Sequence, residues 1–124
     1  MGLLSGLLGN ASEYSVEDAQ KEYGNLLAEN EKIDRAYKLV RDMFIFTNRR
    51  LILIDVQGIT GKKIEYRSIP YSKITQYSIE TSGHFDLDAE LKIWISGVSG
   101  PIEKQFNKSA NIYAVQAELS KHVN

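Results

Sequence analysis

Apolar and polar residues alternate along the middle of the chain, from about residue 33 to residue 107. A period of two places apolar side chains on one face of an extended strand, and turn-forming residues separate each strand from the next. The densest stretch, FIFTNRRLILID (44–55), holds two apolar runs around a short basic turn, which is typical of a tight antiparallel hairpin. The pattern predicts seven antiparallel strands, at residues 33–40, 42–47, 50–56, 62–69, 73–81, 89–96 and 101–107.

The N-terminal part of the chain is helical in character. Ser15 followed by Glu17 and Asp18 is typical of a helix start, because a serine caps the first N–H groups and acidic side chains favour the positive end of the helix. Gly24 is expected to weaken or end this helix. A short amphipathic turn is expected before this helix, with Leu3, Leu4, Leu7 and Leu8 on one face. This turn is a candidate for packing on a neighbouring subunit.

A second helix is expected at the C-terminal end, with residues 107–109 offering its cap. Its apolar residues share one helical face, whereas Gln116, Glu118 and Lys121 are expected to point elsewhere. The apolar face consists of Ile112, Val115, Leu119 and Val123. Such a face suits the cover of an open end of a β structure, so the predicted class is mostly β (α+β) with a terminal helix.

Composition narrows the class of protein further. At 124 residues the chain fits one domain that can bury about two thirds of its unfolded surface. It has no cysteine, so disulfides, thiolate zinc sites and cysteine nucleophiles are excluded. No apolar run approaches the ~20 residues that span a bilayer, and the first residues lack the basic region of a secretory signal. We therefore expect a cytoplasmic location.

Charge is unevenly distributed along the sequence although its formal net value is only −1. Residues 1–34 sum to −5, residues 35–73 to +6 and residues 74–124 to −2. Such segregation supports head-to-tail association of a basic surface with an acidic one. It is equally consistent with a solvated surface on which both signs are mixed after folding.

Several short motifs together resemble the bacterial pleckstrin-homology (PH-like) domain family. They are FTNRRL (46–51), GKK (61–63), IPYSKI (69–74), ETSG (80–83) and FDLDAELKIW (85–94), and the resemblance covers about residues 31–121. It implies a PH-like β-barrel or sandwich of two nearly orthogonal antiparallel sheets, capped by the C-terminal helix. It also implies ring-shaped homo-oligomers. We expect a PH-like domain at residues 31–124, preceded by a helical extension at residues 1–30.

One candidate binding site is a basic patch for an anionic ligand. In an antiparallel meander the turns after the first and third strands lie at the same end, so Arg41, Lys62 and Lys63 are expected to converge. For a phosphoinositide site the resemblance implies a basic pattern, of which this chain offers Lys38 and Arg41, but Met43 stands where the last basic residue would be expected. Each base near a membrane contributes about 1 kcal/mol, so the three would attract anionic lipid weakly and in a salt-sensitive way. The alternative is that they are solvated turn residues.

A second candidate is a set of oligomer contacts. Arg49 and Arg50 are able to pair with carboxylates, within a subunit or between subunits, and the alternative is an exposed basic turn. The candidate acidic partners are Glu80, Asp86, Asp88 and Glu90.

The alternating acids at 86, 88 and 90, together with His84, superficially suggest a metal site. No second histidine lies close by, and a calcium loop needs a richer oxygen shell. No metal or other cofactor is therefore expected.

Catalysis is not expected either. His84 and His122, the only two histidines, are far apart in sequence, and there is no nucleophile elbow or glycine-rich phosphate loop. A recognition helix or an aromatic RNA-binding signature is also lacking, so nucleic acid is not an expected partner. The sequence predicts a non-catalytic interaction domain that forms a homo-oligomer, with another protein as a further partner. The alternative is a peripheral membrane module that binds anionic lipid headgroups.

Overall fold

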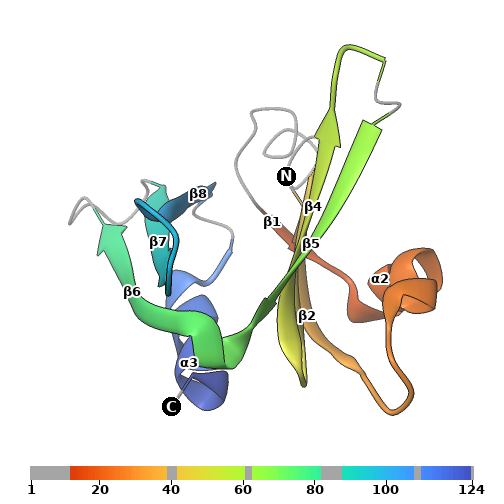
Figure 1. Ribbon diagram of the computed structural model, residues 1–124, viewed down its shortest axis with the longest axis horizontal. Coiled ribbons are helices and arrows are strands. Elements are labelled where there is room, and N and C mark those ends of the chain that lie inside the picture. Colours follow the sequence, from red (N-terminus) through yellow and green to blue (C-terminus); the bar gives the residue numbers. More distant parts are fainter. Residues whose placement is uncertain (1–11, 39–41, 61–62, 82–87, 108–109, 124) are drawn as a thin grey trace.

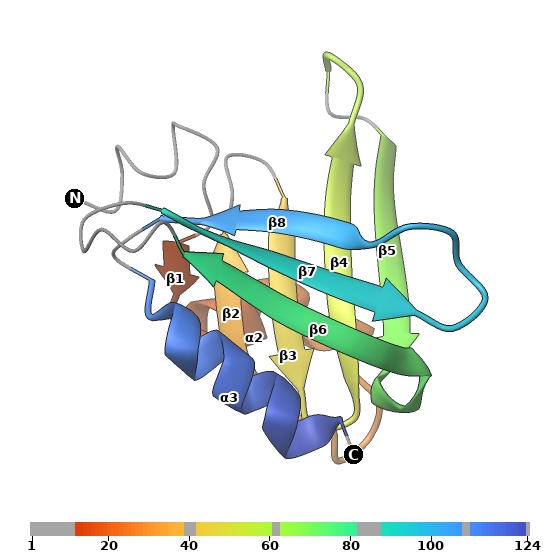
Figure 2. The ribbon, with the colours of Figure 1, turned by 90° about the vertical axis from the view of Figure 1, so that its left-hand side faces the viewer.

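The computed structural model describes residues 12–38, 42–60, 63–81, 88–107 and 110–123. A five-stranded antiparallel sheet holds, in spatial order, β1 (Ser12–Tyr14), β2 (Ile33–Lys38), β3 (Met43–Thr47), β4 (Arg50–Gln57) and β5 (Lys63–Pro70). A three-stranded antiparallel sheet holds β6 (Ile74–Thr81), β7 (Ala89–Ile95) and β8 (Ile102–Phe106). The strands of the smaller sheet run across those of the larger one, as Figures 1 and 2 show.

The seven strands expected from the alternating pattern are confirmed as β2 to β8, with ends that differ by at most two residues. The link between the sheets is the 3-10 turn η2 (Tyr71–Lys73), which follows directly on β5 and leads into β6. Glycines with positive φ lie in the connections, including Gly58 after β4 and Gly97 after β7. Among the described strands, β1 alone was not predicted, since its three residues show no strand periodicity.

The predicted first helix is confirmed as α2 (Val16–Tyr23). The Ser15 side chain accepts a hydrogen bond from the Asp18 N–H, as expected for an N-cap. The chain then continues from Gly24 into the 3-10 turn η1 (Gly24–Leu26). The described part of the N-terminal segment thus contributes a strand to the larger sheet and a helix that lies against it (Figure 1).

The main hydrophobic core lies between the two sheets. Four aromatic rings meet there edge to face: Tyr37, Phe44, Phe46 and Phe106. The helix α3 (Ile112–His122) covers one end of this core with Ile112, Val115 and Leu119, which confirms the predicted cap on the β structure.

The start of α3 differs from the prediction. Its N-cap is Asn111, whose side chain accepts hydrogen bonds from Tyr113 N–H and Ala114 N–H. The expected cap at residues 107–109 was wrong, because the Asn107 carbonyl accepts the Ala110 N–H in a turn that precedes the helix. Lys108 and Ser109 lie outside the described residues.

A second hydrophobic cluster lies on the outer face of the larger sheet. Ala19 of α2 contacts it, and Tyr14, Tyr23, Leu26 and Leu27 pack against it. Its strand residues are Ile33, Ala36, Met43, Ile45, Ile52 and Ile54. The larger sheet is therefore covered on both faces in its centre. Within the described part of the chain, no helix is long and apolar enough to cross a membrane.

Candidate functional site

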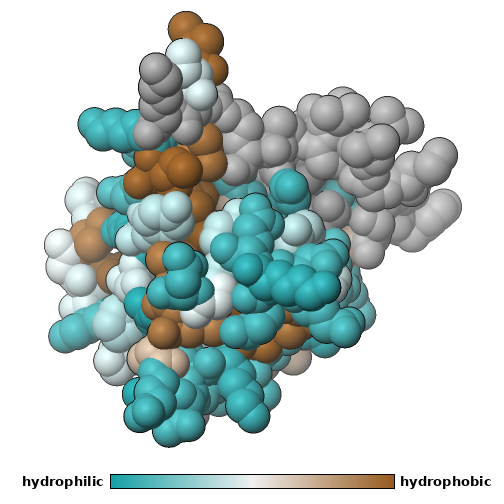
Figure 3. All heavy atoms as spheres, turned by 90° about the vertical axis from the view of Figure 1, so that its right-hand side faces the viewer, coloured by the Kyte–Doolittle hydropathy of each residue, from teal (hydrophilic) through white to brown (hydrophobic). Residues whose placement is uncertain are grey.

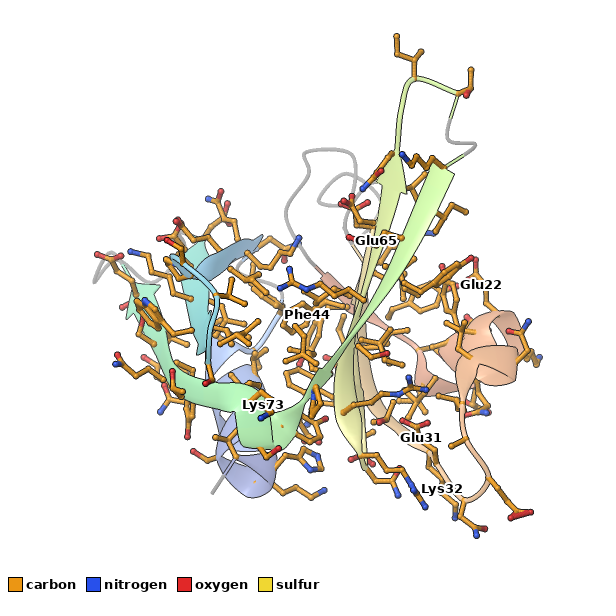
Figure 4. The ribbon with its side chains drawn as sticks, viewed as in Figure 1. Glu22, Glu31, Lys32, Phe44, Glu65 and Lys73 are labelled. Atoms are coloured by element: carbon orange, nitrogen blue, oxygen red, sulfur yellow. The ribbon has the colours of Figure 1, made fainter. Side chains whose placement is uncertain are left out.

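The basic turn between β3 and β4 is held by an acidic residue far back in the chain. The Arg50 guanidinium donates from Nε to Glu31 Oε2 at 2.9 Å and from Nη2 to Glu31 Oε1 at 3.0 Å. Glu31, labelled in Figure 4, lies in the connection that leads into β2. It also donates to Ser68 Oγ and to the Leu26 carbonyl, both at 2.7 Å. Glu31 is the carboxylate that neutralises it among the described residues.

Glu31 is buried and ionised. Burial opposes its charge, but hydrogen bonds from Arg50, Ala28 N–H and Thr47, together with the charge of Arg50, outweigh burial and lower the pKa to about 2. The Thr47 hydroxyl donates to Glu31 Oε2 at 2.6 Å and accepts the N–H groups of Arg49 and Arg50, each at 3.0 Å. Glu31 and Thr47 thus fix the shape of the basic turn.

A cleft of about 370 Å³ opens beside this ion pair. It is lined by Leu26, Leu27, Ala28, Glu31, Arg49, Arg50, Ser68 and Pro70. Arg50 is already neutralised there. Arg49 is exposed, and its Nη2 makes a 3.5 Å hydrogen bond to the Glu29 carbonyl. The cleft therefore combines an apolar wall with one exposed guanidinium at its edge.

The predicted oligomer contacts do not pair with one another among the described residues. The acidic partner of Arg50 is Glu31, which the sequence analysis did not consider. Glu80 is exposed and lies opposite Glu90 in the β6–β7 ladder, while Asp88 is half-buried. Asp86 lies outside the described residues. A contact of Arg49 or Arg50 with these acids of another subunit stays a prediction.

The predicted anionic-ligand patch is described only at Lys63. This residue is exposed at the start of β5, opposite Gln57. Arg41 and Lys62 lie outside the described residues. The β4–β5 register places Arg50 opposite Pro70, so the Arg49–Arg50 turn lies at the other end of these strands, as expected.

A second polar cluster joins β2 to α3. His122 Nε2 lies 3.1 Å from Asp34 Oδ2 and 3.0 Å from Glu118 Oε2. Glu118 is only 8% exposed, so the expectation that it points away from the packed face of the helix was wrong. The Tyr71 ring stacks on the His122 ring with a centroid distance of 4.3 Å and an interplanar angle of 5°.

The sequence held one signal for this cluster, the i, i+4 spacing of Glu118 and His122 on a predicted helix. It held no signal for Asp34, which lies 88 residues before His122. The cluster was therefore not predicted.

An apolar strip follows the free edge of the larger sheet. We call Val56, Ile64 and Tyr66 the β4–β5 strip. In the ladder, Ile64 lies opposite Val56, and Tyr66 lies opposite the buried Ile54, so these side chains continue the outer hydrophobic cluster. Ile64 and Tyr66 are 42% and 49% exposed, and Figure 3 shows hydrophobic surface continuing along this face.

The tip of the same hairpin projects beyond the rest of the molecule (Figures 1 and 2). Ile59 lies in its loop and is fully exposed. This hairpin therefore presents apolar side chains that this chain's described residues leave uncovered.

Comparison with known proteins identifies the family of the chain. Residues 2–123 match the family model described as "Bacterial PH domain". The uncharacterized Bacillus subtilis protein YjqA is 55% identical over 121 residues, which cover 97% of each chain. None of these descriptions names a catalytic activity.

Solved structures agree with this result. A protein with a pleckstrin-homology domain from Shewanella loihica is 46% identical and superimposes with a TM-score of 0.84 over 94% of this chain and 99% of that one. A pleckstrin-homology domain from Shewanella amazonensis, also 46% identical, gives a TM-score of 0.74 over 99% of each chain. The predicted resemblance is thereby confirmed: the chain belongs to the bacterial PH domain family.

Proposed function

We propose that the protein is a non-catalytic interaction domain that assembles with further copies of itself into a closed ring. The observation that carries the proposal is the β4–β5 strip, of which Ile64 and Tyr66 are exposed on the edge strand β5. A second copy of the chain is the proposed occupant of this edge.

The physical argument starts from β5, which pairs with β4 on one side and forms the last strand of its sheet. An edge strand presents unpaired N–H and C=O groups, and natural monomers protect such edges with charge, proline or a cover. The charged residues of β5, Lys63, Glu65 and Arg67, alternate with Ile64 and Tyr66 and therefore lie on the other face of the strand. Ile64 and Tyr66 are thus exposed on a face of the edge strand that carries no charge from β5. Pairing or covering this edge with another copy would bury both the apolar side chains and the backbone groups.

A ring follows if the contact is heterologous, since a head-to-tail interface closes when the rotation between subunits divides the circle. The sequence supports such a contact because β5 belongs to the basic part of the chain, residues 35–73, whereas residues 1–34 are acidic.

The test is the mass of the native assembly by light scattering. We expect a multiple of the 14.0 kDa chain for the wild-type protein and a mass close to one chain for Tyr66→Lys or Ile64→Lys. Tyr113→Lys is the matched control, because Tyr113 is 68% exposed but lies on α3. A wild-type protein that is monomeric, or a Tyr66→Lys variant that keeps the wild-type mass, would contradict the proposal.

A second function, a peripheral membrane module, is favoured by one observation. Ile59 is fully exposed at the tip of the projecting hairpin, and the basic Lys63 begins the next strand. An apolar hairpin tip with a basic side chain beside it, such as Ile59 with Lys63, is suited to insertion into the headgroup region of anionic lipid.

Sedimentation with phosphatidylserine vesicles distinguishes the two functions. Binding at low salt that falls at high salt, and that Ile59→Ser weakens, would support the membrane module. Equal amounts of protein in the supernatant with and without vesicles would leave the interaction domain as the function.

A further inference from the structure

We propose that Asp34, Glu118 and His122 form a binding site for a divalent transition-metal cation such as Zn²⁺, which would link β2 to the capping helix α3. All three ligands come from one chain, so this site is independent of the proposed assembly.

The donor atoms already have the spacing that such a cation needs. One oxygen of each carboxylate and His122 Nε2 lie within 4.8 Å of one another. Metal–ligand bonds of 2.0–2.2 Å place neighbouring ligand atoms about 3.0 Å apart at right angles and about 3.4 Å apart in a tetrahedron. The two distances from His122 Nε2, 3.0 and 3.1 Å, fall at the short end of this range.

The backbone explains why these three side chains converge. The β2–β3 register shifts between Ile33 and Arg35, so a bulge lies at Asp34. A bulge turns a side chain out of the regular alternation, and here it allows Asp34 to reach α3. Glu118 and His122 lie one helical turn apart and therefore share a face of that helix.

A neutral imidazole does not satisfy this arrangement by itself. It carries at most one hydrogen on Nε2, yet two carboxylate oxygens lie within hydrogen-bond distance of that one nitrogen. A dication would instead bind the nitrogen lone pair and both carboxylates at once. Imidazole and carboxylate ligands together suit Zn²⁺ and its neighbours in the first transition series.

The cationic side chains nearby are weakly engaged with these carboxylates. Arg35 Nε lies 3.8 Å from Glu118 Oε1, but its Nη1 lies closer, 3.0 Å, to Glu13 Oε2. Lys121 Nζ lies 4.0 Å from Asp34 Oδ2, and its side chain is 63% exposed. The side chains of Glu118 and His122 are each 10% exposed, so this negative charge lies in a largely dry place.

One feature beside the cluster fits a bound ion. The Tyr71 ring fixes the plane of the His122 imidazole by stacking on it, which orients the nitrogen towards the carboxylates.

The main test is calorimetric titration of Zn²⁺ into the full-length protein after removal of metal with a chelator. We expect one equivalent to bind, and at least a tenfold loss of affinity in Asp34→Asn and in Glu118→Gln. The matched control is His84→Gln, which removes the other histidine of the chain and should bind Zn²⁺ as the wild-type protein does. Circular dichroism without metal would show that each variant is folded.

Two readouts do not depend on a carboxylate variant. Zn²⁺ at 100 times its Kd is expected to raise the unfolding midpoint by about 10 °C, and a chelator should reverse the rise. In His84→Gln, His122 is the only imidazole, so its ring proton resonances should shift when Zn²⁺ is added. Absence of stoichiometric binding, unchanged affinity in both carboxylate variants, loss of binding in His84→Gln, or unmoved His122 resonances would each overturn the proposal.

Discussion

Removal of the Arg50 guanidinium should destabilise the protein strongly, because it leaves the Glu31 carboxylate buried without its counter-ion. The Glu31 side chain is 1% exposed, and Arg50 supplies two of its hydrogen bonds. Breaking a buried ion pair from one side typically costs about 3–5 kcal/mol. We therefore expect Arg50→Ala to lower the free energy of unfolding by about that amount at pH 7, which is a large share of the 5–15 kcal/mol typical of a domain.

The pH dependence gives an independent magnitude. The Glu31 pKa is lowered from 4.5 to about 2 in the folded protein. Because the folded pKa is the lower one, the stabilisation is complete above about pH 4.5 and is lost as the pH falls through about 2. Linkage gives about 3 kcal/mol at pH 7 and about 1.5 kcal/mol at pH 3. Arg50 supplies two of the contributions that lower this pKa, so the difference in stability between wild type and Arg50→Ala should be smaller at pH 3 than at pH 7.

The assay is urea unfolding, followed by the fluorescence of Trp94, at both pH values and at two protein concentrations so that any assembly is detected. Arg49→Ala is the matched control. Arg49 is the preceding residue, but it is exposed and its described hydrogen bond to the Glu29 carbonyl is long, so a change within about 0.5 kcal/mol is expected. Equal losses in the two variants, or a loss in Arg50→Ala that is the same at pH 7 and pH 3, would refute the reasoning. Should Arg50→Ala fail to fold, Arg50→Lys keeps the charge but not the paired geometry and should show a smaller loss.

Four further predictions concern the helix α3 and the N-terminus. Leu119→Ala should lower the free energy of unfolding in urea by about 2–5 kcal/mol, because Leu119 is fully buried. Tyr113→Ala should change this free energy little, because Tyr113 is exposed. Similar losses in the two variants would argue against the helix as a cap on the core. Asn111→Ala should cost about 1 kcal/mol through loss of the N-cap, and an unchanged midpoint would mean that another group caps the helix. Deletion of residues 1–11 should lower the mass of the native assembly without loss of fold, and an unchanged mass would exclude a role in assembly. Deletion of residues 1–30 would also remove α2 and uncover strand residues of the outer cluster such as Ala36 and Ile45, so it should destabilise the fold as well.

Much of the fold was predictable because its elements carry strong local signals. A few neighbouring residues are enough to predict each of these elements: the alternating runs of β2 to β8, the Ser15 cap of α2 and the apolar face of α3. The strand β1 carries no such signal, since it is defined by its pairing with β2. Asn107 and Asn111 are both suitable caps for the last helix, and the turn at Ala110, which depends on the folded chain, selects the second.

The polar clusters were less predictable because their members are distant in sequence. Glu31 lies in a connection 19 residues before Arg50, and only the folded sheet brings the two together. Asp34 reaches His122 through a bulge that the hydrophobic pattern does not show. Glu118 is a buried carboxylate on the packed side of α3, next to His122. A hydropathy pattern assigns any carboxylate to the solvent-exposed face, so it could not predict this position.

The strand β3 occupies the middle of the five-stranded sheet, and all five of its residues are buried. Alternate side chains enter different cores, since Phe44 and Phe46 pack between the sheets while Met43 and Ile45 pack beneath α2. Detachment of α3 would wet one side of this strand and leave the other dry, so its amides should be the last to exchange their hydrogens for deuterium. Because β3 is buried on both faces, the outer elements of the fold can open locally while the centre of the larger sheet stays folded.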